Sequence, residues 1–181
     1  MKKFELTNEF IANRFGTKLF RIRALVEFGD VEAGELGGYV EKESNLGHDD
    51  NAWVYGNARV CGDAQVSGDA RVYGNAWVYG DAQVSGDARV CGDARVCGNG
   101  DYAYAHGFGS VNRTTTFFRL KDGGVGVRCG CFYGTLAQFR DKIRETHGET
   151  KKAQEYLMLA DLMELRFEED ENEVGNRKYV E

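Results

Sequence analysis

The chain contains no proline, although 24 of its 181 residues are glycine. This absence excludes proline-rich linkers and tethers. No segment approaches the roughly eighteen consecutive apolar residues that mark a membrane-spanning helix, and the first residues lack the apolar core of a secretory signal. The formal net charge is only -6, so bulk charge does not favour nucleic-acid binding. These absences predict a cytoplasmic protein with no membrane partner, and they argue against nucleic acid as a ligand.

A six-residue phrase, Gly-Asp/Asn-Ala-x-Val-x, fills the centre of the chain. The alternating Ala and Val place two side chains on one face of a short strand, and the Gly-Asp or Gly-Asn pair supplies a turn. The valines of this phrase are Val54, Val60, Val66, Val72, Val78, Val84, Val90 and Val96, and Tyr102 and Phe108 continue the register. Each phrase is therefore a strand and a corner, and the pattern predicts a β-solenoid.

Longer periods indicate how many sides each coil has. Gln65 recurs eighteen residues later as Gln83, which favours a triangular coil of three phrases. A rival period of twenty-four residues matches Trp53 to Trp77. A four-sided coil with one Val and one Ala per side would leave a centre too wide to fill at protein packing density. We therefore predict a triangular solenoid of roughly four coils.

The segment over residues 1–35 predicts an N-terminal β-hairpin cap. Phe4 and Leu6 begin one alternating apolar and polar pattern, and residues 19–28 form a second. Residues 13–16, Asn-Arg-Phe-Gly, are typical of the turn between two such strands. A cap is needed because the end of a solenoid exposes unpaired strand edges.

The repeat solenoid is assigned to residues 36–109. Val40 and Leu46 keep the six-residue interval, but they are two residues out of register with Val54. This offset predicts an irregular first coil, with the extra residues in a small loop near residues 48–50.

A C-terminal ββαα segment is predicted over residues 110–168, where the repeat has stopped. The sequence alternates over residues 114–120 and again over residues 125–133. The Lys-Asp-Gly-Gly run between them is a hairpin turn signal. This segment is either a cap alone or also a recognition module, and the sequence favours neither.

Two helices follow the predicted hairpin. Thr135 is a helix N-cap, Gly148 is a stop signal, and a second helix is expected over residues 151–167. Its residues available for burial are Ala153, Tyr156, Leu157, Ala160, Leu162, Met163 and Phe167. The remaining residues 169–181 are a mostly charged tail that we expect to fray.

The five cysteines are predicted to be free thiols. Cys61 and Cys97 would lie two coils apart, too distant to bridge at a strand spacing of about 4.8 Å. Cys129 and Cys131 are two residues apart on one expected strand, a geometry that does not suit a disulfide. An odd count without partners indicates a reducing compartment. The Cys-x-Cys pair also lacks the spacing of structural zinc sites, so we expect no metal and no cofactor.

The phrase resembles the hexapeptide repeat of left-handed parallel β-helices, in which an aliphatic residue is followed by a small residue four positions on. The run from Leu19 to Val40, the Ser-Asn-Leu at residues 44–46 and the Asp-Asn-Ala-Trp-Val-Tyr that opens the repeats resemble bacterial and prophage hexapeptide-repeat proteins often labelled transferases. The likeness covers roughly the first 110 residues. It implies a mainly β fold, a left-handed parallel β-helix, and it carries over no reaction.

Hexapeptide acyltransferases resemble this scaffold and generally use a histidine as general base near a subunit interface. This chain has no histidine from residue 51 to residue 105, and His48, His106 and His147 lie outside the regular coils. We therefore expect a non-enzymatic protein-binding or structural solenoid. The prophage-like resemblance implies an inhibitor or adaptor that acts on a host protein. An acyl-CoA-dependent acyltransferase is the alternative.

The residues beside each valine point outward and sort into three faces. Two faces carry Trp, Tyr and Arg, the residues that most often anchor interfaces. The third face carries Gln65, Ser67, Gln83 and Ser85, then Asp101 and Ala103. Stacked Arg and Trp could also serve only to stabilise the sheet, at about 0.5–1 kcal/mol per exposed pair. Because one face lacks them, we expect a protein partner or a second copy of the chain, as in a homo-oligomer, to dock on Trp53, Tyr55, Arg59, Arg71, Tyr73, Trp77, Tyr79, Arg89 and Arg95.

Overall fold

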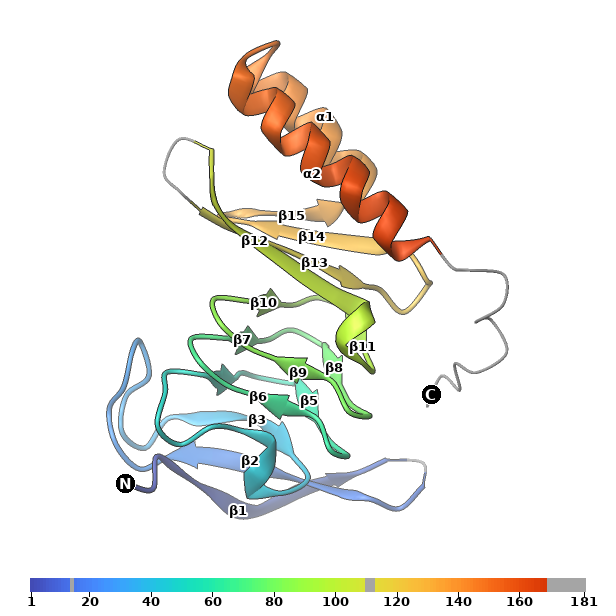
Figure 1. Cartoon of the computed structure of the whole chain (residues 1–181). Helices are drawn as coiled ribbons and strands as arrows, with labels where there is room; N and C mark the ends of the chain where they lie inside the picture. The colour runs from blue at the N-terminus through green and yellow to red at the C-terminus, as the bar shows by residue number, and fades with distance from the viewer. Residues whose placement is uncertain (14, 110–112, 169–181) are drawn as a thin grey trace.

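A computed structural model describes residues 1–13, 15–109 and 113–168. Three parts follow one another along one axis: an N-terminal hairpin, a stack of triangular coils, and a sheet covered by two helices (Figure 1). Arg14 of the expected N-terminal turn and the charged tail over residues 169–181 lie outside the described residues. Within the described residues, no helix is long and apolar enough to cross a membrane.

The N-terminal hairpin is confirmed, and it joins a side of the solenoid. Strands β1 (Phe4–Ala12) and β2 (Lys18–Ala24) pair antiparallel. Strand β2 also pairs with β3 (Leu36–Val40), which begins a parallel ladder with the coils. The result is a sheet in the order β1-β2-β3-β5-β8-β11. Ile22 and Ala24 of β2 are buried against the coil interior.

The repeats form the predicted left-handed parallel β-helix, with about three turns rather than four. Val54 pairs in register with Val72, and Val72 with Val90, so each turn advances eighteen residues. The period of eighteen is therefore confirmed and the period of twenty-four is wrong. The eight coil strands are β4 (Trp53–Val54), β5 (Arg59–Val60), β6 (Gln65–Val66), β7 (Arg71–Val72), β8 (Trp77–Val78), β9 (Gln83–Val84), β10 (Arg89–Val90) and β11 (Arg95–Val96).

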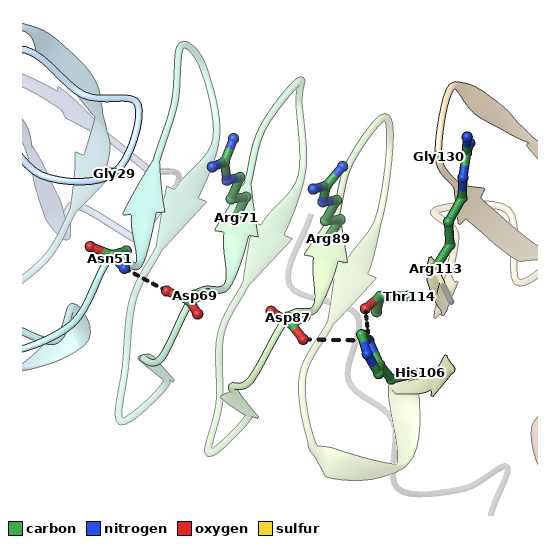
Figure 2. Close-up of a pocket in the computed structure, with 10 residues that line it drawn as sticks. All are labelled: Gly29, Asn51, Asp69, Arg71, Asp87, Arg89, His106, Arg113, Thr114 and Gly130. Carbon is green, nitrogen blue, oxygen red and sulfur yellow. Dashed lines mark hydrogen bonds and ion pairs between the residues drawn. The ribbon is translucent and has the colours of Figure 1, made fainter. Parts of the chain in front are cut away.

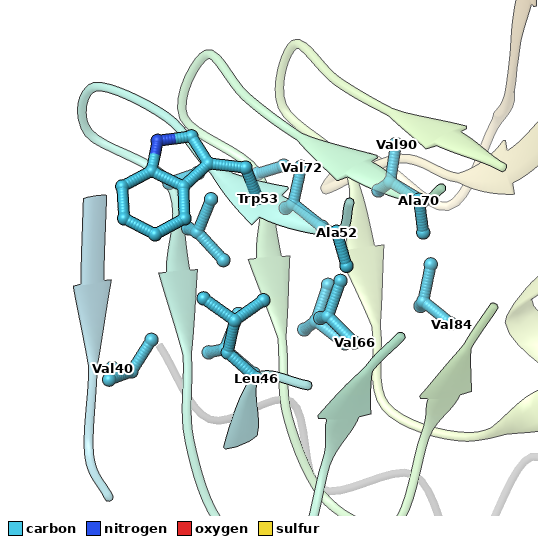
Figure 3. Packing of buried hydrophobic residues seen from close by; sticks show 14 of the residues in the cluster. Val40, Leu46, Ala52, Trp53, Val66, Ala70, Val72, Val84 and Val90 are labelled. Carbon is cyan, nitrogen blue, oxygen red and sulfur yellow. The ribbon is translucent and has the colours of Figure 1, made fainter. Parts of the chain in front are cut away.

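The interior of the coils is filled by the Ala and Val of every phrase. All eight repeat valines, and the alanine two residues before each, have no exposed surface. Figure 3 shows part of this core, with buried side chains of neighbouring coils stacked on one another. Full burial of a valine side chain contributes roughly 1.5–3 kcal/mol. A small and a large apolar residue per side thus fill a narrow triangular core.

The first coil contains the two extra residues that the register predicted. Val40 pairs with Val60 and Leu46 pairs with Val66, an interval of twenty residues instead of eighteen. The added length lies after Leu46, where Asp50 holds the loop. Its carboxylate accepts hydrogen bonds from the Gly68 amide at 2.7 Å and from the Lys3 ammonium at 3.1 Å.

Asn45 closes the same coil from inside the short helix η1 (Glu43–Asn45). Its side-chain amide donates to the carbonyl oxygens of Gly62 at 3.1 Å and of Ala64 at 2.8 Å. Its side-chain oxygen accepts from the Lys42 amide at 2.9 Å. Asn45 is completely buried, so these three bonds replace a strand where the first coil is irregular.

The solenoid ends earlier than expected, because the residues that continue the register belong to another sheet. Strand β12 (Tyr102–Phe108) pairs antiparallel with β13 (Arg113–Arg119), instead of stacking on the coils. It follows the short helix η2 (Asn99–Asp101). The Gly-Asp corner is absent from residues 102–108, so the chain stays extended instead of turning after two residues.

The expected ββαα segment contains one more strand than predicted. The alternation over residues 125–133 is divided into β14 (Val125–Cys129) and β15 (Phe132–Thr135). Gly130, at φ 58°, forms the tight turn between them. Cys129 and Cys131 therefore do not share a strand. With β12 the sheet is four-stranded, in the order β12-β13-β14-β15.

Both helices are confirmed at their expected positions. Helix α1 (Leu136–His147) has a capping box between Thr135 and Gln138, and Gly148 ends it at φ 57°. Helix α2 (Lys151–Phe167) is capped by Thr150. One expected burial is wrong: Leu162 is 54% exposed, because α1 and the sheet cover only one side of α2.

The C-terminal sheet closes the last coil through direct hydrogen bonds. Ala94 forms an antiparallel bridge with Leu120, and the Lys121 amide donates to the Asp93 carbonyl at 3.1 Å. The hydroxyl of Thr116 accepts from the Arg89 amide at 2.9 Å. Backbone groups that a further coil would have used are thus occupied, which is what a cap requires.

Candidate binding surfaces

The outward residues sort into faces as the eighteen-residue period predicts. We call the outward residues of β5, β8 and β11 the tryptophan face, because they centre on Trp77. Those of β4, β7 and β10 form the arginine face, which carries Arg71 and Arg89. Those of β6 and β9 form the glutamine face, with Gln65 and Gln83 in register.

Trp53, which we expected on the arginine face as an exposed anchor, is completely buried. Two aromatic residues of the N-terminal segment cover it. Its ring centroid lies 5.3 Å from that of Phe28 and 6.2 Å from that of Phe4, both in edge-on geometry. Trp53 therefore fastens the N-terminal segment to the first coil, and it is not available to a partner.

Tyr79 is the second expected anchor that the structure buries, with only 8% of its surface exposed. It lies on the tryptophan face beside Trp77, with ring centroids 6.4 Å apart. The expected continuation of the glutamine face is also wrong. Asp101 is buried in η2, and Ala103 lies on β12 in the antiparallel sheet.

The centre of the tryptophan face is a three-layer stack. Trp77 pairs in register with Arg59 on one side and Arg95 on the other, as predicted. The guanidinium carbons lie 5.0 Å and 5.3 Å from the indole centroid. Arg95 Nη1 also donates to the carbonyls of Ala94 at 2.9 Å and Asn75 at 3.1 Å. All three side chains are partly exposed, so the stack lies at the surface, with Arg95 fixed by its hydrogen bonds.

A groove lies on each side of this stack. One, of about 400 Å³, runs along the corner of the coils beside Trp77. Its lining is polar and mainly basic: Asn57, Arg59, Asn75, Trp77, Asp93, Arg95 and Lys121. The other, of about 380 Å³, lies toward the N-terminal hairpin and has Leu19, Cys61 and Tyr79 among its walls. Trp77 is common to both grooves, so it forms the ridge between them.

Cys61 lines the groove toward the N-terminal hairpin, and its environment suppresses the reactivity of its thiol. Burial, reinforced by the nearby Glu41 carboxylate, raises the pKa of the Cys61 thiol to about 11. The thiolate is the nucleophilic form, so Cys61 is almost entirely unreactive at neutral pH. No disulfide joins any of the five cysteines in the described part of the chain, as the sequence predicted. Cys61 therefore offers this groove an apolar contact and no nucleophile.

The arginine face borders a third groove, of about 380 Å³, which Figure 2 shows. Arg71 and Arg89 rise from adjacent coils, and Arg113 faces them from β13. The aspartates of the corner, Asp69 and Asp87, lie on the opposite side of the groove. A neighbouring hollow of about 340 Å³ is lined by Tyr55, Arg71, Tyr73, Arg89 and Arg128.

None of the three histidines forms a catalytic relay with described residues. His48 stacks on Phe4 at 4.3 Å and accepts a hydrogen bond from the Lys3 amide. His147 stacks on Tyr156 at 6.0 Å. His106 lies in the groove of the arginine face, where its Nδ1 is 2.8 Å from the Thr114 hydroxyl and 3.6 Å from Asp87.

Both contacts of His106 fall on the same nitrogen. A serine- or threonine-type relay needs the acid on one ring nitrogen and the hydroxyl on the other. His106 therefore cannot pass a proton from Thr114 to the Asp87 side in this arrangement. Its ring is well exposed, with 59% of the side chain accessible, so it is a surface group of the groove.

The sequence missed three cationic residues that the C-terminal sheet contributes to these grooves: Lys121, Arg113 and Arg128. These three residues lie outside the six-residue repeat and far from the coils in sequence, so periodicity does not place them. A partial signal was available for Arg128. It lies in the alternating segment 125–129, where a charged residue between apolar neighbours marks the outer face of a strand.

Comparison with protein families matches two segments of the chain, residues 64–80 and 82–98, to the YdcK beta solenoid repeat. Each segment begins at the alanine of a glutamine-face strand and spans one triangular coil. The match thus supports the β-solenoid in the most regular part of the chain. A comparison with curated proteins gave no match.

Proposed function

We propose that this chain is a non-enzymatic binding protein that presents the tryptophan face of its solenoid to a protein partner. The observation that carries the proposal is the stack of Trp77 between Arg59 and Arg95. A partner that covers it finds a rigid aromatic and two oriented guanidinium groups, so little side-chain entropy is lost on binding. Trp and Arg are also the commonest residues at energetic centres of interfaces.

The charge of the surface indicates the kind of partner. Burial lowers the pKa of Arg95 from its ordinary value, but an arginine remains charged at neutral pH. The corner groove has three cationic residues, Arg59, Arg95 and Lys121, against one carboxylate, Asp93. An acidic segment of a partner protein fits this groove, with an apolar side chain against Trp77. Complementary charge of this kind favours fast and specific association.

The test is capture of proteins from a bacterial lysate on three immobilised forms of the chain. The wild type is compared with the double variant Trp77→Ala/Arg95→Ala and with the double variant Gln65→Ala/Gln83→Ala on the glutamine face. We expect proteins that the wild type and the glutamine-face variant retain and that the tryptophan-face variant loses. The proposal fails if the glutamine pair is the damaging one, or if both variants capture the same proteins as the wild type.

Two more specific forms of this function rest on fewer observations. A prophage-encoded inhibitor or adaptor of a host protein depends on the resemblance of the first 110 residues. A second copy of the chain on the tryptophan face would make the protein a homo-oligomer. Sedimentation velocity of the wild type and of Trp77→Ala/Arg95→Ala separates self-association from capture of a different protein.

The alternative, an acyl-CoA-dependent acyltransferase, has less support. His106 lies in the groove of the arginine face, and among the described residues no hydrogen bond or ion pair is made by its Nε2. Saturable micromolar binding of acetyl-CoA, with acyl transfer lost in His106→Ala, would replace the binding proposal with an enzymatic one. Calorimetry with acetyl-CoA and CoA measures this directly.

A further inference from the structure

The arginine face places two like charges in direct register. Arg71 on β7 pairs with Arg89 on β10, at a strand spacing of about 4.8 Å. Like charges directly opposite each other destabilise a sheet. On the tryptophan face the equivalent arginines are separated by Trp77, so the repeat itself does not require adjacent arginines. The Arg71 and Arg89 pair therefore destabilises the fold, and the repeat does not require it.

Neutralisation of this pair is incomplete. Arg71 Nη2 lies 2.6 Å from a carboxylate oxygen of Asp30 in the N-terminal segment. Over residues 1–13, 15–109 and 113–168, no carboxylate lies within ion-pair distance of Arg89. The nearby aspartates have other partners: Asp69 accepts from the Asn51 side chain at 2.8 Å, and Asp87 faces His106 at 3.6 Å.

The C-terminal sheet adds two more arginines to the same region. Arg113 lies against Gly130, where any side chain would overlap its Nη1 atom. The Arg128 guanidinium lies over the Tyr73 ring, 5.8 Å from its centroid. As with Arg89, the described part of the chain provides neither with a carboxylate partner. Two separate elements, the coils and the capping sheet, thus bring unneutralised guanidinium groups together.

These groups surround open space. The 380 Å³ groove has Arg71, Arg89 and Arg113 in its walls, and the 340 Å³ hollow has Arg71, Arg89 and Arg128. The two spaces share the Arg71 and Arg89 pair. Figure 2 shows the guanidinium groups of Arg71, Arg89 and Arg113 pointing to one side, away from Asp69 and Asp87.

We propose that the arginine face binds an oxyanion ligand that carries at least two negative charges, in the groove that has Arg71, Arg89 and Arg113 in its walls. The planar fork of a guanidinium matches both phosphate and carboxylate oxygens. A bound anion between Arg89 and Arg71 would offset the repulsion of the register pair. Phosphate esters and polycarboxylates share this chemistry. The site is separate from the tryptophan face, so it does not depend on the protein-binding proposal.

The test is calorimetric titration of the full chain with pyrophosphate and with citrate, at constant ionic strength. We expect saturable binding of at least one of them, weakened by about tenfold or more in Arg89→Gln/Arg113→Gln, the loss expected for one charge-assisted hydrogen bond. Arg144→Gln, an exposed arginine on α1, is the matched control and should bind as the wild type does. Preference for pyrophosphate assigns a phosphate ligand, and preference for citrate a polycarboxylate.

A second readout uses the protein without ligand. Arg89→Gln removes one member of the like-charge pair, so the melting temperature should rise, and the rise should shrink at high salt because salt screens the repulsion. The proposal is overturned if neither anion binds saturably, if the double variant binds them as the wild type does, or if Arg89→Gln lowers the melting temperature at low salt.

Discussion

Trp53 and Trp77 hold equivalent places in the repeat, each directly before a core valine, but only Trp77 reaches the surface. Trp53 is enclosed by Phe4 and Phe28, whereas Trp77 lies between two arginines of neighbouring coils. One phrase of the repeat has thus produced a structural anchor in the first coil and an exposed ridge in the third.

The two tryptophans should therefore differ in their effect on stability. Trp53→Ala should lower the free energy of unfolding by about 3–5 kcal/mol, the range for a large core aromatic. Trp77→Ala should lower it by less, because the indole is already partly exposed, although the change also removes two cation–π contacts. Urea denaturation followed by circular dichroism measures both. Equal losses would contradict the assignment of Trp77 to the surface.

A charge inside the solenoid should prevent folding. Val72 has no exposed surface and lies between Val54 and Val90 in one column. Val72→Asp buries a carboxylate without a partner, at a cost of several kcal/mol. We expect insoluble or unfolded protein by circular dichroism. Gln83→Asp, on the exposed glutamine face, is the control and should stay within about 0.5 kcal/mol of the wild type. A soluble Val72→Asp variant with unchanged melting would refute the core assignment.

Asn45 should tolerate neither removal nor a charge. Asn45→Ala leaves the carbonyls of Gly62 and Ala64 without their donors and should cost about 1–3 kcal/mol. Asn45→Asp should cost more, because an ionised carboxylate would face the same two carbonyl oxygens. Asn57, at an exposed corner, is the control for both changes. The urea midpoint should fall from the wild type to Asn45→Ala and fall again to Asn45→Asp. This order tests the role of the side-chain amide hydrogens.

Two corner glycines should separate backbone strain from steric conflict. Gly56 and Gly80 both have positive φ, 58° and 65°. A Cβ at Gly56 would meet no atom within 4 Å, whereas one at Gly80 would overlap the Cys97 carbonyl of the next coil. Gly56→Ala should cost about 1–2 kcal/mol from the left-handed conformation alone. Gly80→Ala should cost clearly more, and equal melting temperatures would contradict the stacking of these corners.

Alkylation of Cys61 should depend on pH over an unusual range. Because burial raises its pKa to about 11, the thiol stays protonated well above the ordinary value of 9.0. Its rate of reaction with iodoacetamide should rise with pH up to about 11, and at pH 8 it should be about a hundredfold below that of a thiol with the ordinary pKa. Peptide mass spectrometry measures the rate at this residue. A plateau near pH 9 would show that the site is open to solvent.

Periodicity was sufficient to predict the regular coils and one half of the candidate site. The interval of eighteen residues determines which side chains lie above one another, so the place of Trp77 between Arg59 and Arg95 followed from counting. The cap helices followed from Thr135 and Gly148, which mark local ends by their own chemistry.

What the sequence could not predict depends on contacts between distant segments. Burial of Trp53 requires Phe4 and Phe28 to fold over the first coil, and no repeat encodes that approach. Arg113 and Arg128 join the arginine face only because the C-terminal sheet docks on the last coil. Alternation alone also cannot tell a coil strand from an antiparallel one, which is why β12 was misplaced.

Because each coil has eighteen residues, the length of the solenoid can change only in steps of one coil if the faces are to stay aligned. Each regular turn separates the N-terminal hairpin from the C-terminal sheet by one more strand spacing, about 4.8 Å. Insertion or deletion of a whole turn within residues 52–96 would change that distance by one strand spacing and would keep the residues of each face aligned. Insertion of six residues would instead turn the C-terminal unit to the next face. Length and orientation in this protein can therefore change independently, in whole steps.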